Sequence, residues 1–360
     1  MTDNESSRAR RGRRHGRVPN DLIGAAAFLL ASLFAVPVLG QPAGDAPSEK
    51  QAPMPIADAH LHYKWNQAEV TSPEEAVQIL RDNGVELAVV AGRPASKALE
   101  LHALAPDIVV PIYSVYRRGG DWYGWQRRPG LVAEVRKALG SGSYRGIGEL
   151  HLIGGFALRW KRNDVLKDLL ALATEYDVPL LIHTEFSRAD PTLSICRANP
   201  NTRLVLAHAG AALPPDEVER VLSACPNVWM DLSARDPWRF VRFPITGADG
   251  RLLPEWEALV SRWPRRFLIG SDAVWPVDRL DAWDRADTGW QRIGDFLDFH
   301  RRWAGYLPEE VKRRVLLDNA RELFRPPPLP SAETPSDAEA SVPLADQRSP
   351  ATHMSPSSPP

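Results

Sequence analysis

The sequence predicts an α/β fold, a distorted (β/α)8 TIM barrel with disordered N- and C-terminal tails. Apolar runs of strand length recur about every 25 to 35 residues, with amphipathic helical patterns between them. The runs are rich in Val, Ile and Leu and alternate little with polar residues, as expected of parallel strands covered on both faces. Eight such strands that alternate with helices suit a closed barrel.

The predicted strands follow one another at similar spacing. They are 55–62, 85–92, 108–116, 144–152, 178–185, 203–210, 227–234 and 266–275. The first helix, over 72–84, has clear ends, because Ser72 can cap it, Pro73 suits its first turn and Gly84 can end it. Further helices are predicted over 163–177, 215–226, 290–304 and 308–323. An open doubly wound sheet is the alternative, which the absence of a GxGxxG or phosphate-loop pattern after any strand disfavours.

The chain divides into four parts. They are a signal peptide or N-terminal anchor (1–40), a linker (41–54), the barrel (55–325) and a disordered Pro/Ser-rich tail (326–360). The first part combines six arginines with an uncharged apolar stretch over 22–39, which is typical of an export signal, although an uncleaved anchor would look similar. In both cases we expect the barrel outside the cytoplasm, periplasmic or secreted.

Composition narrows the class of partner. The net charge of −1 gives no electrostatic basis for binding nucleic acid, so we expect a small-molecule substrate. A membrane contact would come only through an uncleaved N-terminal segment. Cys196 and Cys225 are too few for a disulfide framework. Because both fall in segments predicted to be helical and buried, we expect them to be unpaired, although export would allow them to pair. The oligomeric state is open, with a homodimer as one option.

Polar side chains collect at the carboxyl ends of the predicted strands. Five of the nine histidines and two carboxylates lie there. These residues are His60, His62, His151, His183, His208, Glu149 and Asp272. Because the carboxyl ends of barrel strands converge on one face, the side chains should meet there. Burying so many polar groups together is costly unless they share a ligand, and a cation is the simplest one.

The spacing of the first two histidines favours a metal site. His60 and His62 are two residues apart, so their side chains leave the same face of a strand and can reach one ion. Nitrogen and carboxylate ligands in an open arrangement fit catalytic zinc, and also manganese or iron. Each residue alone has a plainer interpretation, such as a core histidine, a helix-capping Asp272 or a structural Glu149–His151 pair. Their joint occurrence at strand ends favours the metal.

Several motifs together resemble the amidohydrolase superfamily. They are IADAHLHY, GIGELH, LLIHTE, VLAHAG, GSDAVW and a late LLDNARELF. The closest resemblance is to the amidohydrolase-related branch, which includes aminocarboxymuconate-semialdehyde decarboxylase and related lactonases. The resemblance implies a divalent metal bound by His60, His62, His183 and Asp272. It also implies that His208 acts as an acid or base, or stabilises charge that develops on the substrate.

The fourth strand departs from the pattern of members that bridge two metals with a carboxylated lysine. It carries Glu149 instead, which is similar to the deoxyribonuclease-like branch with GEIGLD, where such a glutamate is a ligand. One ion, zinc before manganese or iron, is therefore the main expectation. A second ion held through Glu149 and His208 is the alternative. Asn319 in LLDNARELF is expected to be structural.

The resemblance and the ligand set predict a metal-dependent hydrolase. The ion would lower the pKa of a bound water to about 7 and polarise the carbonyl of an amide, ester or lactone. Asp272 would take the proton of the water and pass it to the leaving group, while His208 would stabilise the oxyanion. A metal-dependent non-oxidative decarboxylase is the main rival. A catalytically inert exported metal- or solute-binding protein is a further one.

Aromatic and basic residues fall in the predicted loops at the mouth of the barrel. We expect His151, Trp238 and Trp275 to contact the substrate. The other tryptophans and arginines predicted at this rim are Trp65, Trp122, Trp125, Arg93, Arg117, Arg188 and Arg235. Such a rim suits a flat or apolar acid. The segment 235–253 is long enough to act as a lid.

Overall fold

The computed structural model describes residues 54–118, 121–122, 124–152, 160–239, 244–276 and 285–324. The predicted signal or anchor, the C-terminal tail and nearly all of the linker lie outside these residues. Within the described ranges, no helix is both long and apolar enough to cross a membrane.

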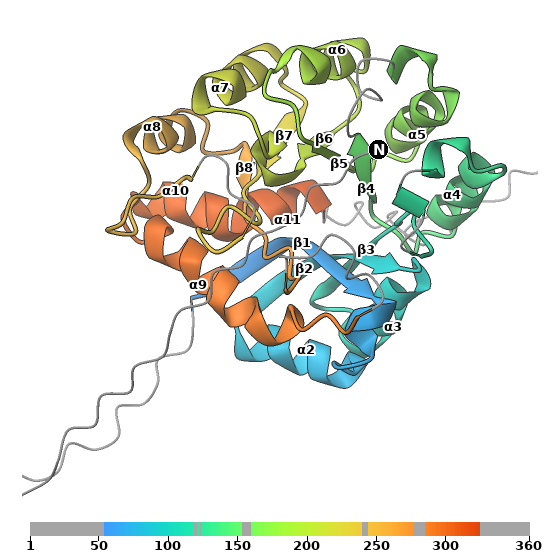
Figure 1. The fold of residues 1–360 in the computed structure, drawn as a ribbon, viewed down its shortest axis with the longest axis horizontal. Coiled ribbons are helices and arrows are strands. Elements are labelled where there is room, and N and C mark those ends of the chain that lie inside the picture. Colours follow the sequence, from blue (N-terminus) through green and yellow to red (C-terminus); the bar gives the residue numbers. More distant parts are fainter. Residues whose placement is uncertain are drawn as a thin grey trace, which may run out of the picture. The chain divides into compact units, whose positions relative to one another are not determined.

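The described part of the chain contains eight parallel strands (Figure 1). They are β1 (Ile56–Lys64), β2 (Val85–Arg93), β3 (Val109–Ile112), β4 (Ile147–Leu152), β5 (Leu180–Thr184), β6 (Leu204–Leu206), β7 (Val228–Asp231) and β8 (Phe267–Leu268). Ladders join β1 to β3 and β4 to β8 in chain order. A bridge between Tyr113 and Ile147 connects the two sheets on one side. On the other, the amide of Ala59 donates to the carbonyl of Ile269 at 2.9 Å. The predicted α/β TIM barrel is confirmed.

Several strands are shorter than predicted, mainly at their carboxyl ends. Of the predicted strand 203–210, three residues belong to β6, and Ala207–Gly210 form a 3-10 turn, η4. Of 266–275, only two residues belong to β8. The backbones of His208 (φ 55°) and Asp272 (φ 41°) are left-handed, a conformation that a strand cannot hold. The distortion of the barrel therefore lies where the polar residues are.

Helices surround the strands and cover the outer face of the barrel (Figure 1). Up to β8 they are α1 (Trp65–Ala68), α2 (Pro73–Asp82), α3 (Ser96–Leu104), η2 (Trp125–Arg127), α4 (Leu131–Gly140), α5 (Asp164–Glu175), α6 (Asp190–Ala198), α7 (Pro215–Ala224) and α8 (Pro254–Arg262). After β8 come η6 (Trp290–Arg292), α9 (Ile293–Ala304), α10 (Glu309–Arg313), η7 (Arg314–Asp318) and α11 (Asn319–Phe324). The cap predicted for the first helix is present, because Ser72 and Glu75 each accept a hydrogen bond from the amide of the other.

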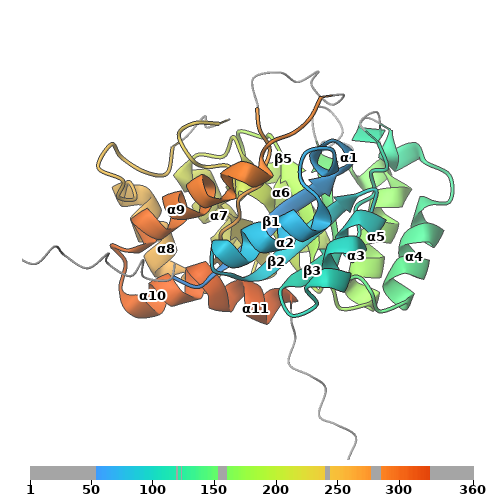
Figure 2. The same cartoon turned by 90° about the horizontal axis from the view of Figure 1, so that it is seen from below.

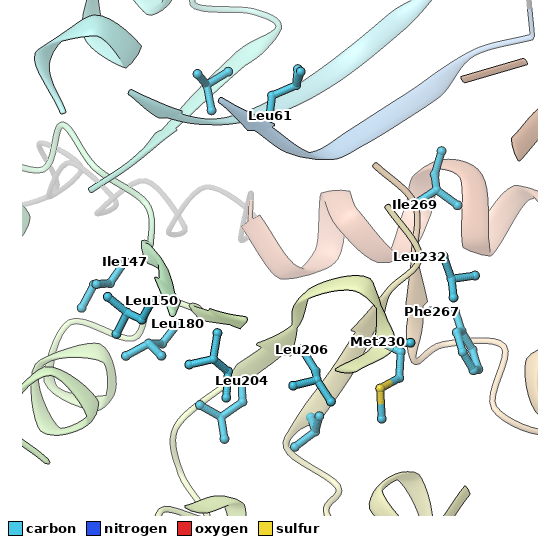
Figure 3. Close-up of a cluster of buried hydrophobic side chains, with 14 of the residues drawn as sticks. Leu61, Ile147, Leu150, Leu180, Leu204, Leu206, Met230, Leu232, Phe267 and Ile269 are labelled. Atoms are coloured by element: carbon cyan, nitrogen blue, oxygen red, sulfur yellow. The ribbon is translucent and has the colours of Figure 1, made fainter. Parts of the chain in front are cut away.

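Apolar side chains pack on both faces of the strands. Figure 3 shows Leu150, Leu180 and Leu204 of β4, β5 and β6 in the layer between the strands and the helices. A second cluster fills the inside of the barrel and includes Ala59 together with Phe324 of α11. Burial of each large side chain contributes about 1.5–3 kcal/mol, so both layers hold the barrel together. Helices α10 and α11 lie along one edge of the barrel in Figure 2, where α11 closes the amino-terminal end of the strands.

Along several strands, the inward positions change from apolar to ionisable towards the carboxyl end. On β2, Ala91 belongs to the interior cluster, and Arg93 is the next inward position. On β5, Leu181 is followed in the same way by His183. This follows from the two-residue period of a strand. The ionisable side chains therefore gather above the apolar interior.

A register irregularity in β1 turns the two histidines of HLH inward. Ala57 and Ala59 both belong to the interior cluster, but Leu61, which a regular alternation would also turn inward, belongs to the outer layer. The pairing of β1 with β2 shifts in this stretch, as at a β-bulge. His60 and His62 consequently both face the barrel interior.

The two cysteines form a disulfide, contrary to the expectation that they are unpaired. Cys196 lies near the end of α6 and Cys225 directly follows α7, with Cα atoms 6.1 Å apart. Both side chains are buried, as predicted. The expectation was wrong because two helices that are separate in the sequence pack side by side, which the local pattern around each cysteine does not show.

Candidate metal centre

The structure brings together the histidines and carboxylates that were predicted at the strand ends. Glu149 of β4 lies among them. Its Oε2 atom is 3.3 Å from Nε2 of His62 and 3.7 Å from Nε2 of His60. Its Oε1 atom is 2.9 Å from Nδ1 of His183 and 3.7 Å from Nε2 of His208. One carboxylate thus faces histidines from β1, from β5 and from the turn after β6.

Ligand-type atoms of the described residues form three groups, in each of which the atoms lie within 4.8 Å of one another. Two of them adjoin Glu149, and these are His60–His62–Asp272 and Glu149–His151–His183. The third consists of His60, His208 and Asp231. The sequence-based prediction placed His183 with the first group, around one ion. The structure groups it with Glu149 and His151 instead, in an arrangement that resembles the two-ion alternative.

The donor set fits a divalent cation. Nε2 of His60 and Nε2 of His62 face each other at 3.2 Å, and Oδ1 of Asp272 is 3.5 Å from Nε2 of His62. Ligand atoms of a tetrahedral zinc ion are separated by about 3.3 Å, given Zn–N bonds of about 2.0–2.1 Å. When both imidazoles are neutral, their lone pairs face each other, and a cation between them would offset this repulsion and that between the buried carboxylates. The spacing of these buried atoms therefore matches that of ligands to one small ion.

Hydrogen bonds fix which ring nitrogen of two histidines is protonated. Nδ1 of His60 is 2.7 Å from Oδ2 of Asp231, and Nδ1 of His208 is 3.0 Å from the carbonyl oxygen of Ser233. A carboxylate and a carbonyl can only accept, so both Nδ1 atoms carry the proton. In the neutral imidazoles both Nε2 atoms then carry a lone pair and can act as ligands or proton acceptors.

Nearby carboxylates raise the pKa of two histidines. Burial alone would lower the pKa of His60, but the charges of Glu149 and Asp231 outweigh it and hold this pKa well above its usual value. Burial also opposes the charged form of His183, yet hydrogen bonds to Glu149 and Glu185 raise its pKa to about 9. In the metal-free protein, both imidazoles are therefore protonated on both ring nitrogens and positively charged at neutral pH.

Burial has the opposite result for other members of the centre. It lowers the pKa of His62 and of His208 to about 4, so both are neutral at physiological pH. Burial would raise the pKa of Asp272, but the charge of His60 holds it well below the usual range. Asp272 is consequently an ionised carboxylate that lies beside a charged His60 and the neutral imidazoles of His62 and His208.

These pKa shifts predict how metal binding depends on pH. If His60 and His183 are ligands, a divalent ion must displace a proton from each, so we expect metal affinity to fall as the pH decreases below about 9. Calorimetric titration of zinc into metal-free protein, in buffers that differ in ionisation enthalpy, measures the protons released. Binding at neutral pH without proton release would contradict the prediction.

Two residues of the centre have left-handed backbones that their surroundings hold in place. The amide of Asp272 donates to the carbonyl of His60 at 2.8 Å, and its carbonyl accepts from Arg239 at 2.5 Å. A Cβ atom at Gly270 would lie 2.7 Å from the Cβ atom of His60, so only glycine allows this close approach of β8 to β1. Such conformations at non-glycine residues such as Asp272 and His208 cost about 1–3 kcal/mol each and are typical of functional sites.

Arg93 lies in the centre, although we expected it on the rim. Its side chain is buried, with Nη2 3.5 Å from Oε2 of Glu149 and 3.4 Å from Nε2 of His62. The guanidinium carbon is 5.1 Å from the ring centroid of Tyr116 and 5.4 Å from that of Trp122. The alternation along β2 carries the signal for this position, because Arg93 falls two residues after an inward alanine.

His151, which was predicted to contact the substrate, lies beside the same two rings, those of Tyr116 and Trp122. Its Nδ1 atom is 2.9 Å from the hydroxyl of Tyr116, and that hydroxyl also accepts from the amide of His151 at 2.8 Å. The ring of Trp122 stacks on the imidazole with centroids 4.0 Å apart. Sequence reasoning did not find Tyr116, which follows β3 at the end of a predicted strand.

The other two predicted substrate contacts pack towards the helix after β8. Trp238 is 47% exposed and contacts the ring of Phe299 in α9. Trp275 is half-buried, with the guanidinium of Arg292 4.1 Å from its ring centroid. Neither of these contacts links a tryptophan to the histidines. Trp125, also predicted at the rim, is buried.

The start of the predicted lid is fixed to the strand ends. Arg235 is buried and its Nε atom donates to the carbonyl of His208 at 2.7 Å. Arg239 is buried as well and donates to carbonyls that follow β8. Residues 240–243 lie outside the described residues. The beginning of 235–253 is thus part of the wall of the centre.

A sequence model of the amidohydrolase family matches residues 45–325. This chain belongs to the amidohydrolase family. The family uses divalent metals, with which the two groups of ligand atoms are compatible. A search of curated proteins gave no match for this amidohydrolase.

Solved structures resemble this amidohydrolase at low sequence identity. YJJV, a TatD homolog from Escherichia coli K12, is 16% identical with a TM-score of 0.52, over 75% of this chain and 97% of that chain. An amidohydrolase from Burkholderia multivorans with bound zinc is 16% identical with a TM-score of 0.47, over 75% and 99%. An uncharacterized TIM-barrel protein from Bordetella bronchiseptica is 15% identical with a TM-score of 0.48, over 71% and 84%. The likeness to the Escherichia coli protein shows a shared fold.

Proposed function

We propose that this amidohydrolase is a metal-dependent hydrolase that cleaves an amide, ester or lactone bond in a small organic acid. The observation that carries the proposal is the buried set of imidazoles and carboxylates around Glu149, at the carboxyl ends of the barrel strands. A divalent ion bound there would supply Lewis-acid polarisation of a carbonyl and activation of water. Zinc suits nitrogen and carboxylate ligands best, while manganese and iron also accept them.

The two ligand groups define how many ions the centre would hold. One ion would be held by His60, His62 and Asp272, with Glu149 beside them. The group of Glu149, His151 and His183 would hold a second ion. Its compact geometry favours this pairing over the one through Glu149 and His208, which the sequence left as an alternative to a single ion. Elemental analysis of the folded protein decides between one and two equivalents.

Asp272 and His208 are the groups that we assign to proton transfer. Asp272 is ionised, and its Oδ2 atom is 3.9 Å from Nε2 of His208. Because Nδ1 of His208 donates to the carbonyl of Ser233, its Nε2 atom carries a lone pair and accepts rather than donates. We therefore assign Nε2 of His208 to relaying a proton, in place of the oxyanion stabilisation expected from the sequence. Asp272 would orient the attacking water and take its proton, which would pass through His208 to the leaving group.

Arg93 supports an acidic substrate. Its guanidinium is buried, and its Nε atom has no hydrogen-bond partner among the residues that the structure describes. An arginine presents a planar fork that pairs with a carboxylate through two hydrogen bonds. The neighbouring rings of Tyr116, Trp122 and His151 offer stacking surfaces for a flat acid.

Replacing Arg93 with lysine is expected to raise KM for a carboxylate-bearing substrate about tenfold, a loss of about 1.4 kcal/mol. Lysine keeps the charge but loses the planar pairing. Initial rates on two lactones, one with and one without a carboxylate, measure the effect, and the uncharged lactone should change less. Arg266→Lys is a matched control, because Arg266 is a partly buried arginine that donates to the carbonyls of Val228 and Cys225. An equal effect on both lactones would contradict a carboxylate contact.

We also propose that the protein is exported. Residues 1–40 lie outside the described residues, so the proposal rests on their sequence, and the Cys196–Cys225 disulfide supports it because disulfides persist in oxidising compartments. Expression of the full chain in a bacterial host, followed by fractionation and N-terminal sequencing, tests both export and cleavage. A small molecule is the only partner that we propose besides a homodimer, which light scattering on purified protein would detect.

Metal removal and restoration test the proposed function. The purified protein is treated with a chelator, assayed on lactones, esters and amides, and assayed again after zinc or manganese is added. We expect hydrolysis to disappear and return, and an unchanged rate after metal removal would refute the proposal. Carbon dioxide release from an aromatic acid would instead identify a decarboxylase, for which Arg93 would also hold the substrate. Ligand binding without turnover would identify an inert binding protein.

A further inference from the structure

Asp231 and Ser233, at the carboxyl end of β7, contact histidines from two other parts of the barrel. Oδ2 of Asp231 is 2.7 Å from Nδ1 of His60. The Ser233 hydroxyl donates to the same Oδ2 atom at 2.7 Å, and its oxygen is 3.0 Å from Nδ1 of both His60 and His208. The Ser233 carbonyl is 3.0 Å from Nδ1 of His208. All four side chains are buried.

The direction of each hydrogen bond is determined. The Asp231 carboxylate and the Ser233 carbonyl only accept, so Nδ1 of His60 and Nδ1 of His208 both donate. The carboxylate cannot turn freely, because its Oδ1 atom accepts from the amide of Ser233 at 2.8 Å. The end of one strand thus fixes the ring orientation and the protonated nitrogen of both histidines.

Asp231 is placed to support the centre rather than to bind the same ion. It forms a compact group with His60 and His208, which by itself would be compatible with a ligand role. However, Oδ2 of Asp231 lies at Nδ1 of His60, whereas the Nε2 atom on the opposite edge of the ring faces His62 at 3.2 Å. An ion shared by His60 and His62 is therefore on the other side of the imidazole from Asp231.

We infer that Asp231 and Ser233 are positioning residues that aim the Nε2 lone pairs of His60 and His208 at the metal centre. This inference rests on the proposed metal-dependent function. Histidine ligands commonly donate their second N–H group to a carboxylate or carbonyl, and loss of such a partner weakens metal binding about 10–100-fold. Because the end of β7 holds both rings, the orientation of His60 on β1 and that of His208 after β6 depend on the same two residues, Asp231 and Ser233.

Asp231→Asn tests the inference with a side chain of the same shape. If the amide oxygen of asparagine accepts from the Ser233 amide, its NH2 group faces Nδ1 of His60, where a donor cannot replace an acceptor. If the amide turns over, its NH2 group meets the Ser233 N–H instead. We expect the zinc Kd of this variant, measured by competition with a chromophoric chelator, to rise about 10–100-fold, with unchanged stoichiometry at saturating zinc.

Two variants of Ser233 keep the test decisive if Asp231→Asn does not fold. Ser233→Ala removes the hydroxyl but leaves the carbonyl, so we expect zinc to bind about 2- to 10-fold more weakly. Ser233→Thr keeps the hydroxyl and should bind zinc within about twofold of the wild type. Equal zinc affinity in both variants and the wild type would overturn the role of Ser233.

Asn319→Ala is the control for a general loss of stability. Its side chain donates to the carbonyls of Pro264 and Phe267, at the opposite end of the barrel. We expect a lower melting temperature with unchanged zinc affinity. Wild-type zinc affinity in Asp231→Asn would overturn the inference, and loss of one zinc equivalent would make Asp231 a ligand instead. A wild-type protein that binds no divalent ion would overturn the proposed function and, with it, this inference.

Discussion

Replacing Asp272 with asparagine is expected to lower kcat about 10²–10⁴-fold while the protein remains folded. The substitution neutralises a carboxylate whose Oδ1 atom lies 3.5 Å from Nε2 of His62 and whose Oδ2 atom lies 3.9 Å from Nε2 of His208. The fold should persist because asparagine tolerates left-handed backbone such as the φ of 41° at this position. The hydrogen bonds that hold the segment use its main chain, from its amide to the carbonyl of His60 and from Arg239 to its carbonyl.

The measurement is kcat at saturating substrate and metal, together with thermal unfolding. Asp177→Asn is a matched control, since Asp177 also has a left-handed backbone (φ 48°) but lies at the exposed end of α5. The control should keep the kcat of the wild type. If Asp272→Asn also keeps it, another group must accept the proton, and the assignment of Asp272 fails.

Removing the disulfide is expected to lower the free energy of unfolding by about 3–4 kcal/mol. The bond between Cys196 and Cys225 closes a loop with a sequence separation of 29, so most of the effect comes from greater freedom of the unfolded chain. Urea denaturation of the Cys196→Ser/Cys225→Ser variant measures it, with reduced wild-type protein as a second measurement. We expect kcat at 25 °C to change little, because the bond joins outer helices. A change below about 1 kcal/mol would mean that the bond does not constrain the unfolded chain.

The barrel and the membership of its centre could be predicted because both depend on periodicity and topology. Strand-length apolar runs define the order of strands, and parallel strands bring their carboxyl ends together. That is sufficient to gather His60, His183 and Asp272 without knowledge of their contacts. Strand lengths were less accurate, since the chain leaves the sheet at the left-handed residues His208 and Asp272.

The position of Asp231 in the centre could have been predicted from the sequence, although we did not assign it. On β7, Trp229 borders the interior cluster, and Asp231 and Ser233 are the next inward positions. Counting by twos from the apolar interior would have placed both in the centre, as it would have placed Arg93. The choice of ring nitrogen in each histidine could not be predicted, because it depends on neighbours from another strand.

The sequence around each residue could not predict the disulfide or the division of the ligands into groups. The pairing of Cys196 with Cys225 depends on how α6 packs against α7. The contact between Glu149 and His183 depends on the pairing register of β4 with β5, in which His151 lies opposite His183. Register between strands is set by whole-sheet packing, so neighbouring residues in the chain carry little information about it.

The change from apolar to ionisable positions along several strands divides the inside of the barrel into two tiers. The tier next to α11 consists of alanines and aliphatic side chains, and it carries none of the charges of the centre. We expect substitutions in that tier to alter stability, and substitutions two residues further along the same strands to alter the proposed metal centre. Because the two tiers are separate, engineering or evolution can change the ionisable residues at the carboxyl ends of the strands while the apolar interior that stabilises the fold stays intact.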